Sequence, residues 1–166
     1  MVFCYHDVPE WYERVMKKQG RAATLVDLDS PDVCYALAGR RSARFVTRIY
    51  EGYLEPAGIT SSEFSILSLL EFTPGITVAE LARKMEMERT TLVRALKPMR
   101  EAGYVCDGEE KLGRAVTLVV SKAGLKKLEQ AKPYWEAAQK AFEERVGKVE
   151  AALFREMALA AVSHRE

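Results

Sequence analysis

The sequence predicts a mainly α-helical protein with one small β-hairpin. Apolar residues recur at three- and four-residue steps in several segments, and helix-start patterns precede them. Alternating apolar residues are found at residues 115–120, as expected of a strand. The 166 residues fit one domain by default, and a hydrophobic content of 48% is enough for a core without suggesting disorder.

A short helix in an N-terminal extension and two further helices are expected before residue 75. Residues 1–29 form an N-terminal extension in which Pro9 favours the start of a short helix. Pro31 predicts the start of a long helix that Pro56 and Gly58 end. Thr60 and Glu63 have capping-box spacing, which predicts a second helix, closed by residues 74–75. The long helix carries an apolar stripe of Leu37, Phe45, Val46, Ile49, Tyr50 and Tyr53.

A third and a fourth helix are separated by a very short connection. Thr77 and Glu80 repeat the capping-box spacing and predict a helix from about residue 77 to 85. Residues 86–88 then join it to a helix within 88–104, which Gly103 ends. This is the helix, tight turn, helix spacing of a DNA-reading helix-turn-helix.

The fourth helix has two different faces. At helical spacing its apolar side consists of Leu92, Ala95, Leu96 and Met99. Opposite them are Thr90, Arg94, Lys97 and Glu101, with Thr91 and Pro98 at the margins. Basic residues are concentrated here, with no acid from residue 89 to 100, although the whole chain has 25 basic and 24 acidic residues. A charged stripe often simply faces water, but the preceding helix favours contact with DNA.

A β-hairpin is expected next. Residues 104–106 can start a strand, residues 107–113 are turn-rich and charged, and residues 115–120 form the returning strand. Two helices followed by a hairpin make a winged helix-turn-helix. Lys111 and Arg114 are then placed where a wing brings cations to phosphates or to the minor groove.

Two more helices complete the chain, and both have an apolar stripe. The first follows Ser121, with Pro133 as an expected kink, and the second begins near Val149. A monomer of this size would struggle to cover such stripes, so we expect two chains to bury them together. The expected organisation is an extension (1–29), a helical dimerisation region (30–58 and 121–166) and a winged helix-turn-helix domain (59–120).

Residues 88–99 and 114–124 resemble the MarR family of bacterial transcriptional regulators, and the likeness extends from about residue 34 to 162. The recognition-helix motif and the wing arginine, Arg114, carry this resemblance. The chain departs from the family pattern at two positions. Leu112 replaces the acidic residue usual two positions before the wing arginine, and Glu88 replaces the usual Asp at the cap of the recognition helix. The resemblance implies a homodimer whose recognition helices enter successive major grooves of a pseudo-palindromic site, roughly 34–36 Å apart. The residues expected to contact double-stranded DNA are Arg89, Thr90, Thr91, Arg94, Lys97, Lys111 and Arg114.

The resemblance also implies regulation by a ligand. A small aromatic or phenolic acid would bind between the helical region and each winged domain, and would release a repressor from DNA. Such a ligand needs a cation for its carboxylate and aromatic walls for its ring. Candidate residues are Arg40, Arg41, Arg44, Arg48, Tyr50, Tyr53 and Trp135, although arginines on a helix mostly face solvent and aromatic side chains mostly pack.

The three cysteines, Cys4, Cys34 and Cys106, predict neither a disulfide framework nor a metal site. Cys34 lies near the position of the reactive cysteine in thiol-sensing members of the family, so a redox-sensing regulator is one alternative. The tyrosines that would hold the thiolate are missing from the expected spacing. We therefore expect Cys34 to be a buried structural residue.

Other classes of function are less well supported. The sequence contains no visible catalytic constellation or cofactor motif, which argues against an enzyme. A winged-helix protein-interaction module that does not bind DNA is a second alternative, but the cationic, threonine-bearing face favours DNA. With neither a signal peptide nor an apolar run long enough for a membrane, we expect a cytoplasmic protein.

Overall fold

The computed structural model describes residues 31–112 and 115–163. The chain divides into two compact units, residues 1–42 and 43–166. In the first unit, a 3-10 turn, η1 (Pro31–Val33), precedes the first turns of the long helix α2 (Tyr35–Leu54). The helix therefore starts a few residues later than predicted. The short helix expected within residues 1–29 lies outside the described residues.

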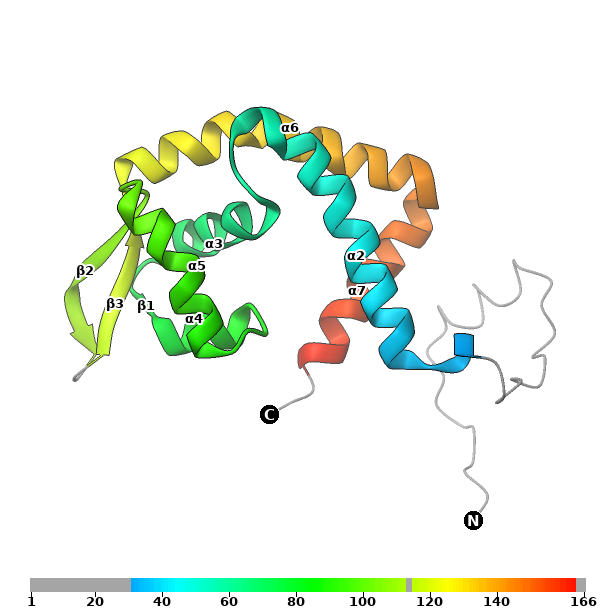
Figure 1. Ribbon diagram of the computed structural model, residues 1–166, viewed down its shortest axis with the longest axis horizontal. Coiled ribbons are helices and arrows are strands. Elements are labelled where there is room, and N and C mark those ends of the chain that lie inside the picture. Colours follow the sequence, from blue (N-terminus) through cyan, green and yellow to red (C-terminus); the bar gives the residue numbers. More distant parts are fainter. Residues whose placement is uncertain (1–30, 113–114, 164–166) are drawn as a thin grey trace, which may run out of the picture. The chain divides into compact units, whose positions relative to one another are not determined.

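The second unit has the predicted helices and hairpin strands in the predicted order, together with one short strand that was not predicted (Figure 1). The rest of α2 leads through η2 (Glu55–Ala57) to α3 (Ser61–Phe72), and β1 (Ile76–Thr77) leads directly into α4 (Val78–Lys84). The recognition helix is α5 (Arg89–Glu101), and the hairpin consists of β2 (Val105–Leu112) and β3 (Ala115–Val120). Two final helices are α6 (Lys122–Val146), which continues through Pro133, and α7 (Lys148–Ser163).

The core of this unit is made by the apolar faces that the helical spacing predicts. On α5, Leu92, Leu96 and Met99 are buried, and Ala95 packs against the same core. Burial of such side chains contributes about 1.5–3 kcal/mol each. Other buried members of the core are Leu54, Ile59, Phe64, Ile66, Leu67, Leu70, Ile76, Leu81, Ala82, Val105, Leu118, Leu128 and Ala131.

Both predicted capping boxes are confirmed. Thr77 accepts a hydrogen bond from the Glu80 backbone N–H at 3.2 Å, and the Glu80 carboxylate accepts from the Thr77 N–H at 2.9 Å. Thr60 and Glu63 make the same exchange at the start of α3. Two hydrogen bonds to its carboxylate hold the pKa of Glu80 below its ordinary value. The larger effect comes from the Thr77 backbone N–H and the smaller from the Thr77 hydroxyl group. These caps fix where α3 and α4 begin.

The sheet departs from the prediction in two ways. Residues 107–112 are not a loop, because β2 extends to Leu112 and pairs with β3 again after a register shift between Asp107 and Lys111. Pairing of Asp107, Lys111 and Leu112 with β3 continues the strand through a segment whose local composition had suggested a turn. The sheet also has a third strand, since β1 pairs with β3 through Ile76 and Thr77, in the order β1-β3-β2.

The expectation that Cys34 is buried was wrong. Its side chain is exposed. Cys34 immediately precedes α2, where its carbonyl oxygen accepts the N–H of Ala38. The neighbouring Tyr35 is also exposed.

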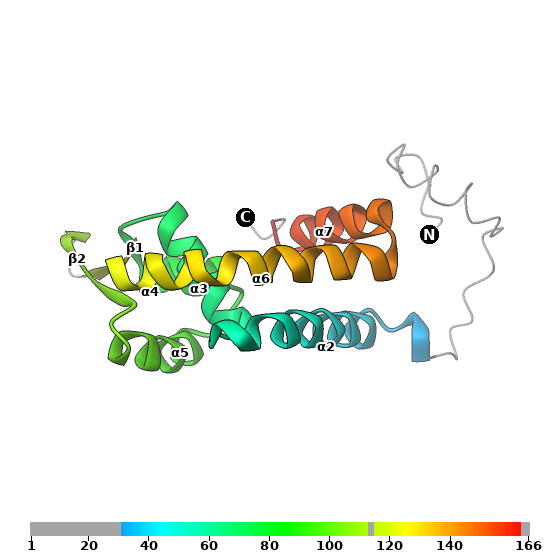
Figure 2. The same cartoon turned by 90° about the horizontal axis from the view of Figure 1, so that it is seen from above.

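The final two helices pack on each other in the C-terminal half of α6 (Figure 2). Gly147 separates them, and the rings of Phe142 on α6 and Phe154 on α7 lie 5.7 Å apart. Much of α7 nevertheless remains uncovered. Its exposed large apolar residues are Val149, Phe154, Met157, Leu159 and Val162.

A junction joins the end of α5 to the start of α6. Gly103 turns the chain with a φ of 72°, after which the Tyr104 carbonyl accepts the Ser121 N–H at 2.9 Å. The Ser121 hydroxyl donates to the Gly103 carbonyl at 2.5 Å and accepts the N–H of Gly124 at 3.0 Å. A Cβ at Gly124 would lie 2.3 Å from the Tyr104 carbonyl oxygen, so a residue without a side chain is needed here.

We expect Gly124→Ala to destabilise the protein by about 1–3 kcal/mol, because the added methyl group meets backbone that cannot move away cheaply. Gly52→Ala is the matched control, since Gly52 also lies within a helix but nothing stands within 4 Å of a Cβ there. That change should stabilise by about 0.5–1 kcal/mol through helix propensity. Thermal or denaturant unfolding measures both, and equal effects of the two changes would contradict this account of the junction.

Candidate nucleic-acid interface

The polar face predicted for the recognition helix is exposed. Thr90, Arg94, Lys97 and Glu101 are all exposed on α5, as are Arg89, Thr91 and Pro98. Thr90, Arg94 and Lys97 lie on the opposite side from the buried Leu92, Leu96 and Met99, and Thr91 lies at the margin. Arg89 is exposed in the first turn of α5, but helical spacing places it beside the apolar side. The five residues of α5 that the sequence singled out for DNA are therefore all exposed, although Arg89 does not share the polar face.

Lys97 has an acidic neighbour that does not remove it from this surface. Its Nζ lies 3.9 Å from Glu101 Oε1, one turn further along α5. Both side chains are well exposed, at 77% and 66%. Such a pair contributes about 0.3–0.5 kcal/mol at most. The ammonium group of Lys97 can therefore exchange this partner for a phosphate or a base edge at little cost.

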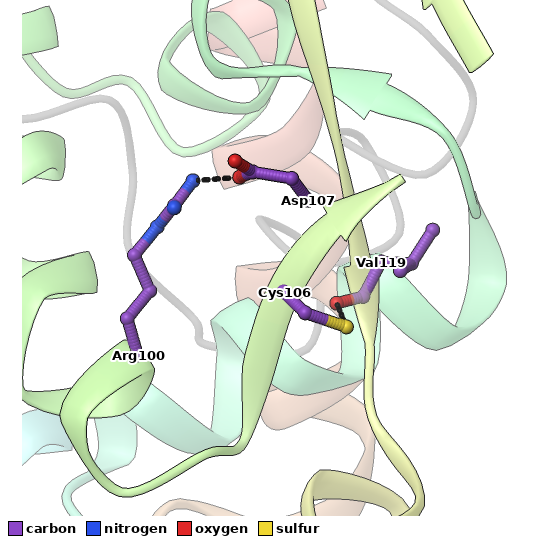
Figure 3. A network of polar contacts seen from close by, with 4 residues as sticks. All are labelled: Arg100, Cys106, Asp107 and Val119. Atoms are coloured by element: carbon purple, nitrogen blue, oxygen red, sulfur yellow. Dashed lines mark hydrogen bonds and ion pairs between the residues drawn. The ribbon is translucent and has the colours of Figure 1, made fainter. Parts of the chain in front are cut away.

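Arg100 has a firmer partner on the hairpin (Figure 3). Its Nη2 lies 2.5 Å from Asp107 Oδ1, so an ion pair joins the last turn of α5 to β2. The next strand residue, Cys106, faces a different neighbour and directs its Sγ at the Val119 carbonyl oxygen at 3.9 Å. The pair links the orientation of the hairpin to that of the recognition helix.

The wing residues are described only in part. The backbone of Lys111 lies in β2 and pairs with Val116 of β3, so the residue is near the tip of the hairpin. Its side chain and the whole of Arg114 lie outside the described residues. Their contacts with DNA stay predictions from the sequence.

The turn between α4 and α5 is tight and has an unusual conformation. Met87 donates its N–H to the Ala82 carbonyl at 2.9 Å, and Glu86 donates to Arg83 at 3.1 Å. Glu86 has a φ of 50°, a left-handed conformation that costs a residue with a side chain some free energy. The turn makes the change of direction from α4 to α5 abrupt, as a helix-turn-helix requires.

The residues predicted to bind a ligand do not form a single site in the structure. Arg48 and Tyr53 of α2 line one cavity of about 550 Å³, with Phe45, Ile49, Gly52, Ala141 and Arg145. Arg44 is exposed one turn before Arg48. Arg40 and Arg41 are exposed in the part of α2 that belongs to the other compact unit. Trp135 stacks on Phe64, with ring centroids 5.8 Å apart, and packs against the core.

Tyr50 lies at a second cavity, of about 290 Å³, between α2, α6 and α7. Its hydroxyl group donates a hydrogen bond to Gln139 Oε1. Burial raises the pKa of Tyr50, and the negative charge of Glu143 raises it further, while Arg155 acts in the opposite direction. The phenol therefore stays neutral at physiological pH.

Two negative findings concern the described residues. None of the helices in the described segments is long and apolar enough to cross a membrane. Among the side chains that the structure describes, no group of three or more from His, Cys, Asp and Glu could hold a metal ion.

Comparisons with known proteins identify the family. A MarR family model matches residues 57–110, from η2 to β2. A DNA-bound structure of the transcriptional regulator MosR from M. tuberculosis is 30% identical, with a TM-score of 0.66, and the match covers 80% of this chain and 99% of MosR. The chain belongs to the MarR family.

Two further comparisons give a related transcriptional regulator and the same fold. YwoH of Bacillus subtilis (strain 168), an uncharacterized HTH-type transcriptional regulator, is 33% identical over 92 residues. That match spans 54% of this chain and 66% of YwoH, which is just under two thirds of the relative. CouR of Rhodococcus jostii RHA1, solved with p-coumaroyl-CoA, has a TM-score of 0.69 at 16% identity, over 83% of this chain and 98% of that one. This likeness supports the fold.

As a member of the MarR family, the protein is a DNA-binding transcriptional regulator with a winged helix-turn-helix. Sequence reasoning overlooked three side chains near the predicted sites. Asp107 pairs with Arg100, Arg145 shares a cavity with Arg48, and Val93 is exposed on α5. Spacing along α5 could have pointed to Val93, whereas the other two depend on contacts between separate elements.

We expect Asp107→Asn to strengthen operator binding by this MarR-family protein, because the change frees the Arg100 guanidinium group for a phosphate. The dependence of log K on log salt concentration should steepen by about one unit. Mobility shifts at several salt concentrations measure both. The control is the double variant R100A/D107N, which has no arginine to release and should show no steeper slope. An unchanged slope for D107N would contradict the expected release of Arg100.

Proposed function

We propose that this regulator binds a pseudo-palindromic operator as a homodimer, and that it acts as a repressor. Thr90, Thr91, Arg94 and Lys97 enter the major groove, while Arg89 contacts the backbone. The wing residues Lys111 and Arg114 contact the backbone or the minor groove. The observation that carries this proposal is the outward, cationic and hydroxyl-bearing face of α5, set by the burial of its opposite side.

The side chains of this face suit DNA chemically. Arginine can donate two hydrogen bonds to the O6 and N7 atoms of guanine, and threonine can contact base edges or phosphates. A recognition helix reads bases mainly through its N-terminal residues. Arg89 to Arg94 occupy the first turns of α5 and are exposed apart from Leu92. The DNA-bound MosR supports this use of the fold, since its sequence is 30% identical.

Exposed apolar surface supports the homodimer. In α2, every residue of the predicted apolar stripe is half-buried or exposed, and only Leu54, outside that stripe, is buried. The large side chains of α7, including Met157 and Leu159, are also exposed. Apolar surface of this extent on helices marks a protein interface. Self-association through a twofold axis would bury it and present two recognition helices to successive major grooves.

The function is tested by mobility shifts with intergenic DNA from upstream of the protein's own gene. Tight, salt-sensitive binding with a clear preference for one sequence supports the proposal. Binding without sequence preference would contradict the operator proposal, and no binding at all would favour the winged-helix interaction module instead. Adding peroxide, with Cys34→Ser as control, tests the redox-sensing alternative in the same assay.

Arg94→Ala should weaken operator binding by about 1–3 kcal/mol and relax the preference at one base position, because a guanine contact is lost. Binding to a library of single-base operator variants measures both effects. Lys140→Ala is the control, since it also removes one exposed cation, but from α6. Unchanged affinity and base preference in the Arg94 variant would contradict the major-groove assignment.

We infer that a small aromatic acid releases the protein from DNA by binding the cavity beside Arg48. The residues that line this cavity come from α2 and α6 of the helical region, and not also from the winged domain as the sequence predicted. The guanidinium group of Arg145 lies 5.3 Å from the centre of the Phe45 ring, and Tyr53 adds a second aromatic wall. Among the described residues, Arg48 forms no ion pair, so it is available to a carboxylate. Two cations and two aromatic rings match the chemistry of such a ligand.

Arg48→Ala should raise the concentration of aromatic acid needed to release half of the bound operator by about tenfold or more, because a charged hydrogen bond is lost. DNA affinity without the acid should stay unchanged. Arg44→Ala is the matched control, one turn away on α2 and not among the residues that line the cavity. A titration of the operator complex with a panel of aromatic acids compares the variants. Equal effects of the two changes would place the ligand elsewhere.

A further inference from the structure

Val93 interrupts the polar surface of the recognition helix. Its side chain is 51% exposed, whereas Leu92, Leu96 and Met99 are buried. No other large apolar side chain of α5 is exposed. On the helix surface Val93 stands one turn from Arg89 on one side and from Lys97 on the other. It therefore lies at the edge of the face that we propose for DNA.

The folding of the chain does not account for a valine at this position. Val93 is neither part of the core nor packed against it. A β-branched residue also has a lower helix propensity than alanine, lysine or arginine. Single exposed apolar residues are ordinary on protein surfaces. This one is flanked by cations in the first turns of a recognition helix, where side chains meet base edges.

The major groove offers one apolar group to such a side chain. Among the four bases, thymine alone carries a methyl group at C5, and apolar side chains read it by contact. We propose that Val93 is a specificity-determining residue that packs against the 5-methyl group of one thymine in each half of the operator. This inference rests on the proposed DNA-binding function, and it adds a preference that Thr90, Arg94 and Lys97 do not supply through hydrogen bonds.

Uracil provides the test, because replacing a thymine by uracil removes only the methyl group. An operator is first selected from random duplexes with the wild-type protein, and each thymine is then replaced in turn. Wild-type affinity should fall about three- to fivefold at one position of the half-site, as expected when one methyl group loses its apolar contact. Val93→Ala should bind the thymine and uracil operators equally at that position. Val93→Thr, which keeps one methyl group in the same shape, should retain part of the preference.

Val116→Ala is the matched control, since Val116 is an exposed valine on β3 of the hairpin. It should leave uracil sensitivity unchanged, because a wing does not reach the thymine methyl group in the major groove. Thermal unfolding checks that the valine variants keep their stability. Full uracil sensitivity in Val93→Ala, or none at any thymine in the wild type, would overturn this proposal alone. Failure of the wild type to select any sequence would instead overturn the DNA-binding function, and this proposal with it.

Discussion

Burial of one side of α5 is the constraint on which the proposed site depends. Leu92, Leu96 and Met99 are almost fully enclosed by the core. Because side chains on a helix keep a fixed angular spacing, enclosing these three determines which residues point outward. Arg94 and Thr90 thus owe their position to packing on the far side of the helix. Close-packed interiors resist small shifts, so the outward face is presented in a defined orientation.

The orientation of α5 is also coupled to α6. The coupling is made by the junction of Gly103, Tyr104, Ser121 and Gly124. It fixes the end of the recognition helix to the first turn of α6 through backbone groups and one hydroxyl. Further along, α6 carries Ala141 and Arg145, which line the cavity beside Arg48. One continuous helix therefore connects the proposed ligand site to the base of the recognition helix. A rigid element held at both sites is a physical route by which occupancy of one can bias the other.

Local patterns predicted most of the helical structure. The capping boxes at Thr60 and Thr77 could be predicted because the two residues of each box lie only three positions apart in the sequence. The buried side of α5 could be predicted from the spacing of its apolar residues. Features that depend on separate elements were not predictable in this way. The two-residue strand β1 exists because β3 lies beside it, and the charged residues after Asp107 extend β2 because the same strand pairs with them.

The candidate sites follow the same rule. The α5 residues proposed to read DNA lie on one helix, and spacing correctly predicted that Thr90, Arg94 and Lys97 share its exposed side. The ligand candidates came from several turns of α2 and from α6, and the structure distributes them over two cavities, the core and solvent-exposed positions. The exposure of Cys34 was missed because burial at a helix end depends on neighbours that the local sequence does not specify.

Pro98 removes one backbone hydrogen bond from the recognition helix. Proline has no backbone N–H, so the Arg94 carbonyl lacks the donor that would otherwise lie one turn further on. Both residues are exposed, and water can satisfy the carbonyl at little cost. The missing hydrogen bond falls between the turns that carry Thr90 and Arg94 and the turn that Gly103 and Tyr104 anchor. Around Pro98 the course of the helix therefore depends more on the packing of Leu96 and Met99 than on its own backbone, so a change in the core at these two residues would alter the angle of the reading end.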